Sequence, residues 1–208
     1  MTRRLLKGLV GLLVIVGLVT VAGAIWFASA GISARAEPSR FEAGLARTLR
    51  SAAIPRDAKS RTNPITATDE NLEEGLAHFA DHCAVCHGND GSGDTTFGRG
   101  LYPRPPDLRL APTQELSDGE LFYIIENGVR LTGMPAFGDG SGGSAEGSWG
   151  LVHFIRRLPK LTPDELRRME MLNPKSPEHW QQMEEERKLL EGDTAAPKPA
   201  TKPHIHKH

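Results

Sequence analysis

The chain has 208 residues, a formal net charge of −1 and only two cysteines. A nearly neutral charge gives no electrostatic reason to expect a nucleic-acid partner, and we expect none. Two cysteines also exclude a structural zinc site built from two cysteine pairs. The information about function therefore lies in local motifs.

The N-terminal segment is uncharged and apolar. Residues 8–33 contain no charged side chain. A helix of that length, at about 1.5 Å per residue, is long enough to cross a hydrocarbon core of roughly 30 Å. Basic residues at positions 3, 4 and 7 precede it, so the positive-inside rule places the N-terminus in the cytoplasm and the rest on the periplasmic side. We expect residues 1–33 to be a transmembrane anchor.

A cleaved signal peptide is the alternative for this segment. Ala28-Ser29-Ala30 and Ala34-Arg35-Ala36 both resemble signal-peptide cleavage sites. The apolar core of a signal peptide is only about 7–15 residues long, and this longer segment favours the anchor. Both interpretations place the following domain outside the cytoplasm.

The charge changes sign along the chain. Residues 34–63 contain seven basic and three acidic residues and are predicted to be a basic linker, with a short helix over residues 41–46 near the membrane surface. Residues 66–158 contain no lysine, six arginines and 14 acidic residues, a net charge of −8. Because complementary fields speed the encounter of two proteins, we expect partners of this acidic region to dock through basic surfaces.

The segment before the first cysteine is predicted to be an amphipathic helix over residues 69–80. Leu72, Leu76 and Phe79 share one helical face with Cys83. A glycine inside this helix, Gly75, costs about 1 kcal/mol relative to alanine. We therefore expect Gly75 to lie where another backbone comes close.

Both cysteines belong to the motif Cys83-Ala84-Val85-Cys86-His87. C-x-x-C-H is the attachment signature of c-type haem. Each thiol can form a thioether to a vinyl group of the haem, and the next residue, His87, is held beneath the iron as an axial ligand. The motif predicts one covalently bound haem c.

Two other readings of the cysteine pair are weaker. A redox dithiol is expected within a βαβ pattern, and the surrounding sequence has none. A structural zinc site needs four ligands, and only His78, His82 and His87 lie close to the pair. We therefore expect haem rather than a dithiol or zinc.

Two helices and a methionine-containing turn follow. Ser117-Asp118-Gly119-Glu120 is a capping box that opens a helix, and Gly128 is its expected C-cap. The next segment, Gly133-Met134-Pro135, offers a thioether, a soft ligand that suits haem iron. The alternative is that Met134 fills a gap in the core. A last helix over residues 149–158 is expected to end at Pro159.

The ordered set of motifs resembles the class I c-type cytochromes over residues 64–158. The matching pieces are Gly75-x-x-x-Phe79, Cys83-x-x-Cys86-His87-Gly88, Pro106-Asp107-Leu108, Gly133-Met134-Pro135 and the last helix with Trp149. The resemblance implies an all-α class I cytochrome c fold over residues 64–160, wrapped around one covalent haem with His87 and Met134 as axial ligands. A transmembrane helix precedes this domain and a helical tail follows it.

The same resemblance implies further contacts to the haem. The carbonyl of Pro106 is the expected acceptor for the second ring nitrogen of His87, which would fix its tautomer. Candidates for binding the haem propionates are Arg104, Arg109, Arg130, Tyr102 and Trp149. Other histidines that compete for the sixth position are His78, His82 and His153, and we expect none of them to ligate.

The C-terminal quarter is predicted to be a helical extension over residues 161–192 and a disordered tail over residues 193–208. The methionines of the extension lie in a polar sequence, which sets Met134 apart from them. The tail ends in His204, His206 and His208. Three alternating imidazoles can bind copper or zinc, and the alternative is a solvated tail without a ligand.

The sequence thus predicts an electron carrier with no catalytic residues. Two protein ligands fill both axial positions of the iron and leave no site for substrate. We expect redox proteins of a respiratory chain as partners. Alternatives are a haem c subunit of a larger oxidase or dehydrogenase complex, a haem enzyme or gas sensor with an open sixth position, and a copper-handling protein that uses the histidine tail.

Overall fold

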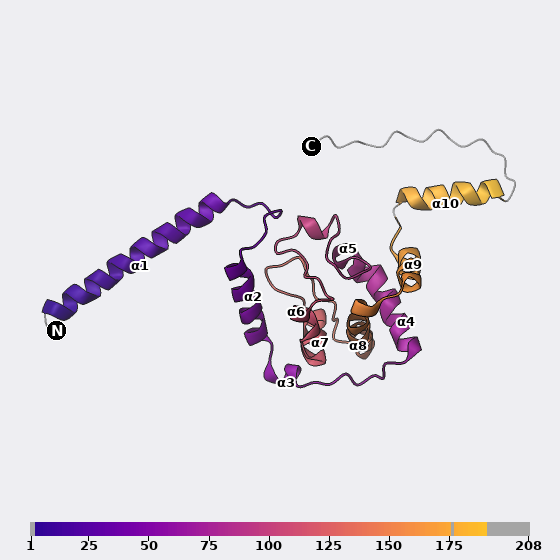
Figure 1. The fold of residues 1–208 in the computed structure, drawn as a ribbon, viewed down its shortest axis with the longest axis horizontal. Helices are drawn as coiled ribbons and strands as arrows, with labels where there is room; N and C mark the ends of the chain where they lie inside the picture. The colour runs from indigo at the N-terminus through magenta and orange to yellow at the C-terminus, as the bar shows by residue number, and fades with distance from the viewer. Residues whose placement is uncertain (1–2, 176, 191–208) are drawn as a thin grey trace.

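The computed structural model describes residues 3–175 and 177–190, and the histidines predicted to bind metal in the tail lie outside these residues. All regular structure within the described residues is helical. Figure 1 shows a compact group of helices and loops with one long helix, α1, extending from it. The predicted all-α fold class is confirmed.

Helix α1 (Arg3–Ala30) contains the apolar N-terminal segment. Its large apolar side chains are exposed, and none packs against the rest of the described chain. The helix is long and apolar enough to cross a membrane, a property that an N-terminal signal sequence shares.

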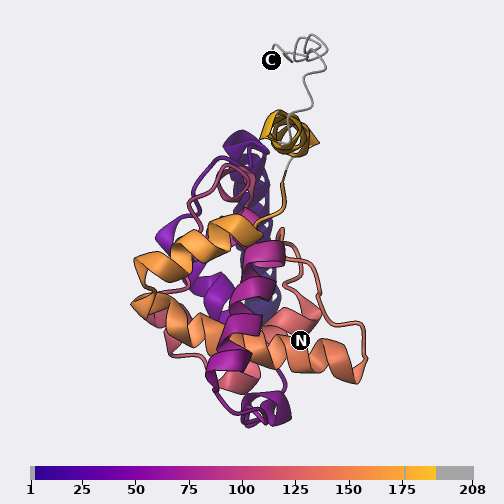
Figure 2. The same ribbon diagram turned by 90° about the vertical axis from the view of Figure 1, so that its right-hand side faces the viewer.

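The core is organised around two crossing helices, α4 (Asp69–His78) and α8 (Gly142–Arg157), which Figure 2 shows lying across each other. A Cβ atom on Gly75 would lie 2.6 Å from the carbonyl oxygen of Gly150. The close approach expected at Gly75 is therefore confirmed. Only a residue without a side chain lets these two backbones meet.

Helix α7 (Asp118–Asn127) packs on α8 and completes the core. The ring of Phe122 stacks on Trp149 at a centroid distance of 4.0 Å. The predicted capping box is present, since Ser117 and Glu120 bond each other's backbone N–H groups, and Gly128 ends the helix. Short helices η2 (Gly98–Gly100) and α6 (Ala111–Gln114) lie in the connections.

The range predicted to be a basic linker contains two helices, α2 (Arg40–Ala53) and α3 (Arg56–Lys59). Ile54 and Ala58 are buried, and a Cβ on Gly119 of α7 would overlap the carbonyl oxygen of Ala58. This range therefore packs against the helical core, although the domain boundaries themselves remain a prediction.

The short helix η3 (Leu158–Lys160) follows α8, and the range predicted to be a helical extension contains α9 (Pro163–Leu172) and α10 (Pro177–Leu190). A capping box formed by Thr162 and Glu165 opens α9. Met169 is completely buried in the main hydrophobic cluster. The expectation that the methionines of this segment lie in a polar tail is therefore wrong for Met169, because α9 folds back onto the core.

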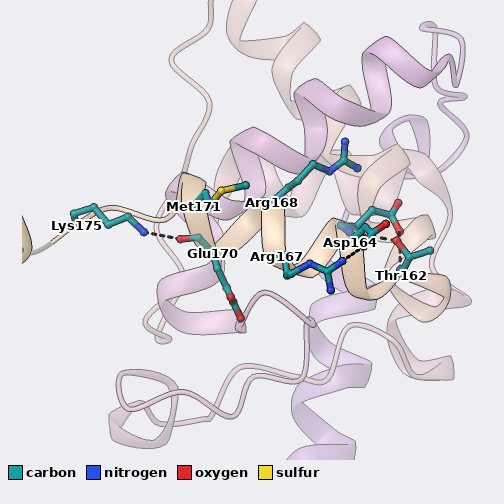
Figure 3. A pocket seen from close by; sticks show the side chains of 8 residues that line it. Thr162, Asp164, Arg167, Arg168, Glu170, Met171 and Lys175 are labelled. Carbon is teal, nitrogen blue, oxygen red and sulfur yellow. Dashed lines mark hydrogen bonds and ion pairs between the residues drawn. The ribbon is translucent and has the colours of Figure 1, made fainter. Parts of the chain in front are cut away.

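An open surface depression lies along α9, and Figure 3 shows the side chains that line it. Arg167 pairs with Asp164, and the Nζ atom of Lys175 donates to the carbonyl oxygen of Glu170 at 2.6 Å. Arg168 reaches Glu73 of α4 at 2.9 Å. These charged side chains are paired with neighbouring protein groups, so we interpret the depression as a surface feature of α9.

Candidate haem site

The attachment motif begins in a π-helical turn. Helix α4 continues as η1 (Phe79–Cys83), which is π-helical, and then as the short helix α5 (Ala84–His87). Wide turns of this kind occur often at functional sites, because they shift side chains relative to a regular helix. The sequence predicted a continuous α-helix over residues 69–80, and the structure replaces its last two residues with the start of this turn.

Asn173, at the end of α9, supports the attachment motif from both sides. Its Nδ2 atom donates to the carbonyl oxygen of Ala80 at 2.7 Å. The side chains of Asn173 and Asn89 also exchange hydrogen bonds at 2.8 and 3.0 Å. Ala80 precedes the first cysteine and Asn89 follows His87. Sequence patterns did not identify Asn173, since no local signal links it to a motif more than 80 positions earlier.

The two cysteines are partly buried, unpaired thiols. Burial, with a smaller contribution from Cys86, raises the pKa of Cys83 to about 12. Burial also raises the pKa of Cys86. A redox dithiol depends on a stabilised thiolate, so this environment disfavours that reading. Thiols that remain protonated until they react suit the formation of permanent thioethers.

His87 is positioned as a neutral imidazole. Burial lowers the pKa of His87 to about 4, and a smaller interaction with the backbone of Pro106 opposes the shift. The Nδ1 atom is buried and makes no hydrogen bond within normal geometric limits. A neutral imidazole with one nitrogen beside a backbone acceptor is the form in which histidine binds a metal.

The loop that carries Pro106 lies against the chain that follows His87. Gly93 N–H donates to the carbonyl of His87 at 2.7 Å, and a Cβ on Gly93 would lie 2.5 Å from the carbonyl oxygen of Pro105. Leu108 N–H donates to the carbonyl of Gly91 at 2.8 Å. These contacts bring Pro106 towards His87, as the family resemblance implies.

Met134 lies in a turn that folds back on the end of α7. Met134 N–H donates to the Thr132 hydroxyl at 3.1 Å, and the Met134 carbonyl accepts from Val129 N–H at 3.1 Å. Gly128 has φ of 64°, and a Cβ there would lie 2.7 Å from the carbonyl oxygen of Met134. The turn is thus held by backbone contacts that need a glycine, and the Met134 side chain remains half-buried.

The histidine side and the methionine side meet through a glycine contact. A Cβ on Gly133 would lie 2.7 Å from the side chain of Leu101, which begins the loop that leads to Pro106. The turn that carries Met134 and the loop that leads to Pro106 therefore approach each other at Gly133 and Leu101.

The predicted propionate candidates divide into engaged and available groups. Arg109 is held by Asp107 at 2.8 Å and Asp90 at 2.9 Å. Trp149 is buried in the core stack, and Arg130 is exposed. Tyr102 is also engaged, because its hydroxyl bonds Glu42, whereas Arg104 pairs with Glu37 through Nη1 and keeps a buried Nε atom without a partner.

The competing histidines are engaged elsewhere. The Nε2 atom of His153 lies 2.9 Å from the carbonyl oxygen of Ile65. His78 and His82 pack edge to face at 5.1 Å, and His82 pairs with Asp81 at 3.3 Å. Within the described residues, no group of three or more His, Cys, Asp or Glu side chains could hold a metal ion.

The residues present fit a covalently attached haem. Two protonated thiols, a half-buried neutral imidazole and a half-buried thioether would provide both attachment points and both types of axial donor. The buried guanidinium edge of Arg104 is suited to an anionic group. His87 would bind the iron from one side, and the loop of Met134 supplies the candidate for the other.

Comparison with known proteins supports this fit. Residues 70–155 match the family model described as cytochrome c oxidase, cbb3-type, subunit III. No curated protein matches the chain. The matched residues run from the first turn of α4 almost to the end of α8 and include the attachment motif and Met134. Residues 70–155 of this chain therefore form a c-type cytochrome domain, the kind of domain that carries out haem-based electron transfer.

Proposed function

We propose that the chain is a membrane-anchored, mono-haem c-type cytochrome that carries single electrons between respiratory proteins, with His87 and Met134 as axial ligands. The observation that carries the proposal is the site itself: Cys83, Cys86 and a half-buried neutral His87 on one side, and the glycine-framed turn of Met134 on the other. Bound haem supplies a one-electron couple, so one electron enters from a reduced donor and one leaves to an oxidised acceptor.

The protein keeps this one-electron couple reversible by fixing the positions of its two ligand residues, His87 and Met134. His87 sits at the end of α5, and Gly88 with φ of 75° turns the chain away immediately after it. Met134 completes the second axial position and leaves none for a substrate. A thioether opposite an imidazole raises the reduction potential relative to two imidazoles. The residues therefore favour electron transfer over oxygen chemistry.

Electrons would cross where the site reaches the surface. Val85, between the two cysteines, is 51% exposed, and Leu131, in the loop of Met134, is 92% exposed. The acidic residues of the domain give a net charge of −8 over residues 66–158. We propose that a partner with a basic surface docks there. Its electron-transfer rate should fall steeply as salt is added, and a rate independent of salt would contradict this part of the proposal.

The proposed location follows from α1. Its 28 residues are followed by the cytochrome domain, and three basic residues lie at its N-terminal end. An anchor would keep the haem domain on the periplasmic side and restrict its search for partners to the membrane plane. Carbonate extraction of native membranes tests this, because an anchored protein stays in the membrane fraction and a cleaved one leaves it.

A second candidate function is that of a haem subunit in a larger complex. The matched family model is named for a subunit of an oxidase, and the chain continues beyond the matched residues into α9 and α10. Purification from native membranes in mild detergent separates the two roles. A free carrier elutes alone, whereas a subunit elutes with stoichiometric partners.

The central test is a redox titration of the full chain in detergent, followed by absorption spectroscopy. We expect a single one-electron transition, a six-coordinate low-spin haem and the weak far-red band of an iron–thioether bond. A high-spin ferric spectrum that changes readily on addition of cyanide or imidazole would show an open sixth position and would contradict the carrier assignment.

A further inference from the structure

Three buried side-chain polar atoms in the described part of the chain lack a hydrogen-bond partner. One is the Nδ1 atom of His87, the candidate iron ligand. The other two are the Nε atoms of Arg50 and Arg104. Leaving a buried guanidinium N–H unpaired costs more than leaving a neutral group unpaired. The Nε atom of each arginine therefore lacks an acceptor, although the Nη1 atom of Arg104 pairs with Glu37.

Arg50 is half-buried on α2, whereas Arg47, one turn earlier, is exposed. Ala43, Arg50 and Ile54 follow the spacing of one helical face, and Ile54 is buried. Burial, and to a smaller extent Arg47, lower the pKa of Arg50, and the attraction of Glu120 opposes them only partly. Glu120 itself accepts from the backbone N–H of Ser117 at 2.9 Å.

Arg104 belongs to the loop that leads to Pro106 and His87. Its Nη1 atom reaches Glu37, just before α2, at 3.0 Å, while its Nε atom is left unpaired. In the same loop the hydroxyl of Tyr102 donates to Glu42 on the first turn of α2. The N-terminal end of α2 is therefore attached to the histidine side of the site.

The other end of α2 approaches α7, the helix that leads to the turn of Met134. Lys59, after α2, donates to Ser51 at 3.2 Å and approaches Glu120 of α7 at 3.6 Å. The hydroxyl of Ser117 donates to the carbonyl of Lys59 at 2.8 Å. Helix α2 thus spans from the loop on the histidine side to the helix on the methionine side, as its position beside α6 and α7 in Figure 1 illustrates.

We propose that α2, which lies outside the residues matched to the cytochrome family, forms a wall of the haem pocket, and that Arg50 and Arg104 pair with the two carboxylates of the haem. The inference rests on the proposed haem site and adds to it a residue, Arg50, from outside the cytochrome domain. The two haem carboxylates would accept charge-assisted hydrogen bonds from the two buried Nε atoms, which have no other acceptor.

The test compares variants of the full-length, haem-loaded chain. Arg50→Ala removes the charge and Arg50→Lys retains it, while Arg47→Ala removes an exposed charge one turn away on the same helix. A guanidinium beside a haem carboxylate favours the reduced iron, which carries less positive charge. We expect a lower midpoint potential in Arg50→Ala, a smaller shift in Arg50→Lys and the wild-type value in Arg47→Ala, whose charge is screened.

A spectroscopic readout separates pairing from general structural damage. Resonance Raman bending bands of the haem propionates should shift in Arg50→Ala and in Arg104→Ala but not in Arg47→Ala. Wild-type potential and Raman bands in both Arg50→Ala and Arg104→Ala would overturn the proposal. If Arg50→Ala does not accumulate, Arg50→Lys decides, because unchanged propionate bands in that variant would also overturn it.

Two further outcomes identify other causes. If the wild-type potential changes when inorganic phosphate is added and the propionate bands do not depend on Arg50, a free anion is the partner and the proposal is wrong. If the wild-type chain incorporates no haem at all, the proposed function fails. Haem-loaded wild-type protein with unaffected Arg50→Ala and Arg104→Ala variants overturns the pairing of these arginines with the haem carboxylates and leaves the proposed function standing.

Discussion

The two sides of the haem site are built in different ways. His87 stands at the end of a helical segment, with Phe79 and Ala80 buried immediately before it and Asn173 bonded on either side of the motif. Met134 stands in a turn held by Thr132, Val129 and the glycine at 128. Core packing supports the first side, and a few backbone hydrogen bonds support the second.

The difference indicates which of the two candidate ligands is displaced more easily. Local opening is easiest where few buried apolar contacts must break. The histidine side shares the main core with α4, α8 and α9, whereas the methionine side depends on a loop outside the helices. We therefore expect any change in coordination to begin at Met134.

The largest effect is expected from His87→Ala. The two thioethers still hold the haem, but the iron loses the ligand that the core positions. We expect a high-spin spectrum and loss of the reversible couple, measured by absorption spectroscopy and redox titration. His153→Ala is the control, because the Nε2 atom of His153 lies 2.9 Å from the Ile65 carbonyl oxygen. A low-spin spectrum that survives His87→Ala would show that another residue is the ligand.

Met134→Ala should cost the sixth ligand while leaving the fold intact, since Met134 is half-buried and lies outside the main core. We expect a lower midpoint potential, loss of the far-red thioether band and binding of added imidazole. Met171→Ala, at an exposed position, should change none of these. If the potential and ligand binding of Met134→Ala match the wild type, Met134 is not the ligand.

Gly128→Ala tests the turn without substituting the candidate ligand Met134. Gly128 has φ of 64° and ψ of −169°, a conformation that is essentially restricted to glycine, and a Cβ would lie 2.5 Å from the backbone of Pro135. Strain of about 1–3 kcal/mol is expected, relieved by displacing the turn. The far-red band should weaken.

Gly88→Ala provides the matched comparison for this turn. Gly88 has a similar φ of 75°, but a Cβ there would meet a side-chain atom, Asp90 Oδ1 at 2.9 Å, rather than backbone. The substitution should destabilise the fold and leave the far-red band in place. If Gly88→Ala and Gly128→Ala lose the far-red band equally, the histidine side and the methionine side do not differ in the way proposed here.

Asn173→Ala should loosen the histidine side by a smaller amount. It removes the donor to Ala80 and the pair with Asn89, a loss of about 1–3 kcal/mol if the carbonyl remains buried. We expect a lower urea midpoint with an unchanged midpoint potential. Asn127→Ala, which removes only a bond within α7, is the control. Unchanged stability would show that α9 does not support the motif.

The smallest effect concerns pH. Hydrogen bonds from Arg109, outweighing burial, lower the pKa of Asp107. A carboxyl whose pKa is lowered by folding adds stability above its unfolded pKa of about 4, and this stability is lost as pH falls through the folded pKa. Asp107→Asn should therefore narrow the stability difference between pH 7 and pH 3. An identical difference in both proteins would mean that the pair contributes nothing.

Much of the site could be predicted from local patterns. The capping box at Ser117, the glycine at the end of α7 and the close approach at Gly75 are each confirmed, because each depends on residues only a few positions apart or on a strong steric rule. The π-helical turn could not be predicted, since its cost and benefit depend on how Phe79 and Ala80 pack against the other helices.

Two residues outside the motifs show the limit of what sequence patterns can predict. Arg50 lies in a range predicted to be a basic linker, although the spacing from Ala43 to Ile54 could have indicated a packed helix. Asn173 lies in a range predicted to be an extension, and nothing near it in the sequence points to Ala80. Both act across long separations along the chain.

By itself the sequence determined the attachment motif, the helical class, the apolar N-terminal segment and the candidate ligands His87 and Met134, because thioether attachment, helix capping and apolar periodicity are local properties. The tertiary structure decided which polar groups are buried and which of them lack partners. It joined α2 and α9 to the cytochrome domain and left the Nε atoms of Arg50 and Arg104 without acceptors. Whether a polar group is buried and whether it has a hydrogen-bond partner depend on the packing of the whole molecule, so no short stretch of sequence determines either property.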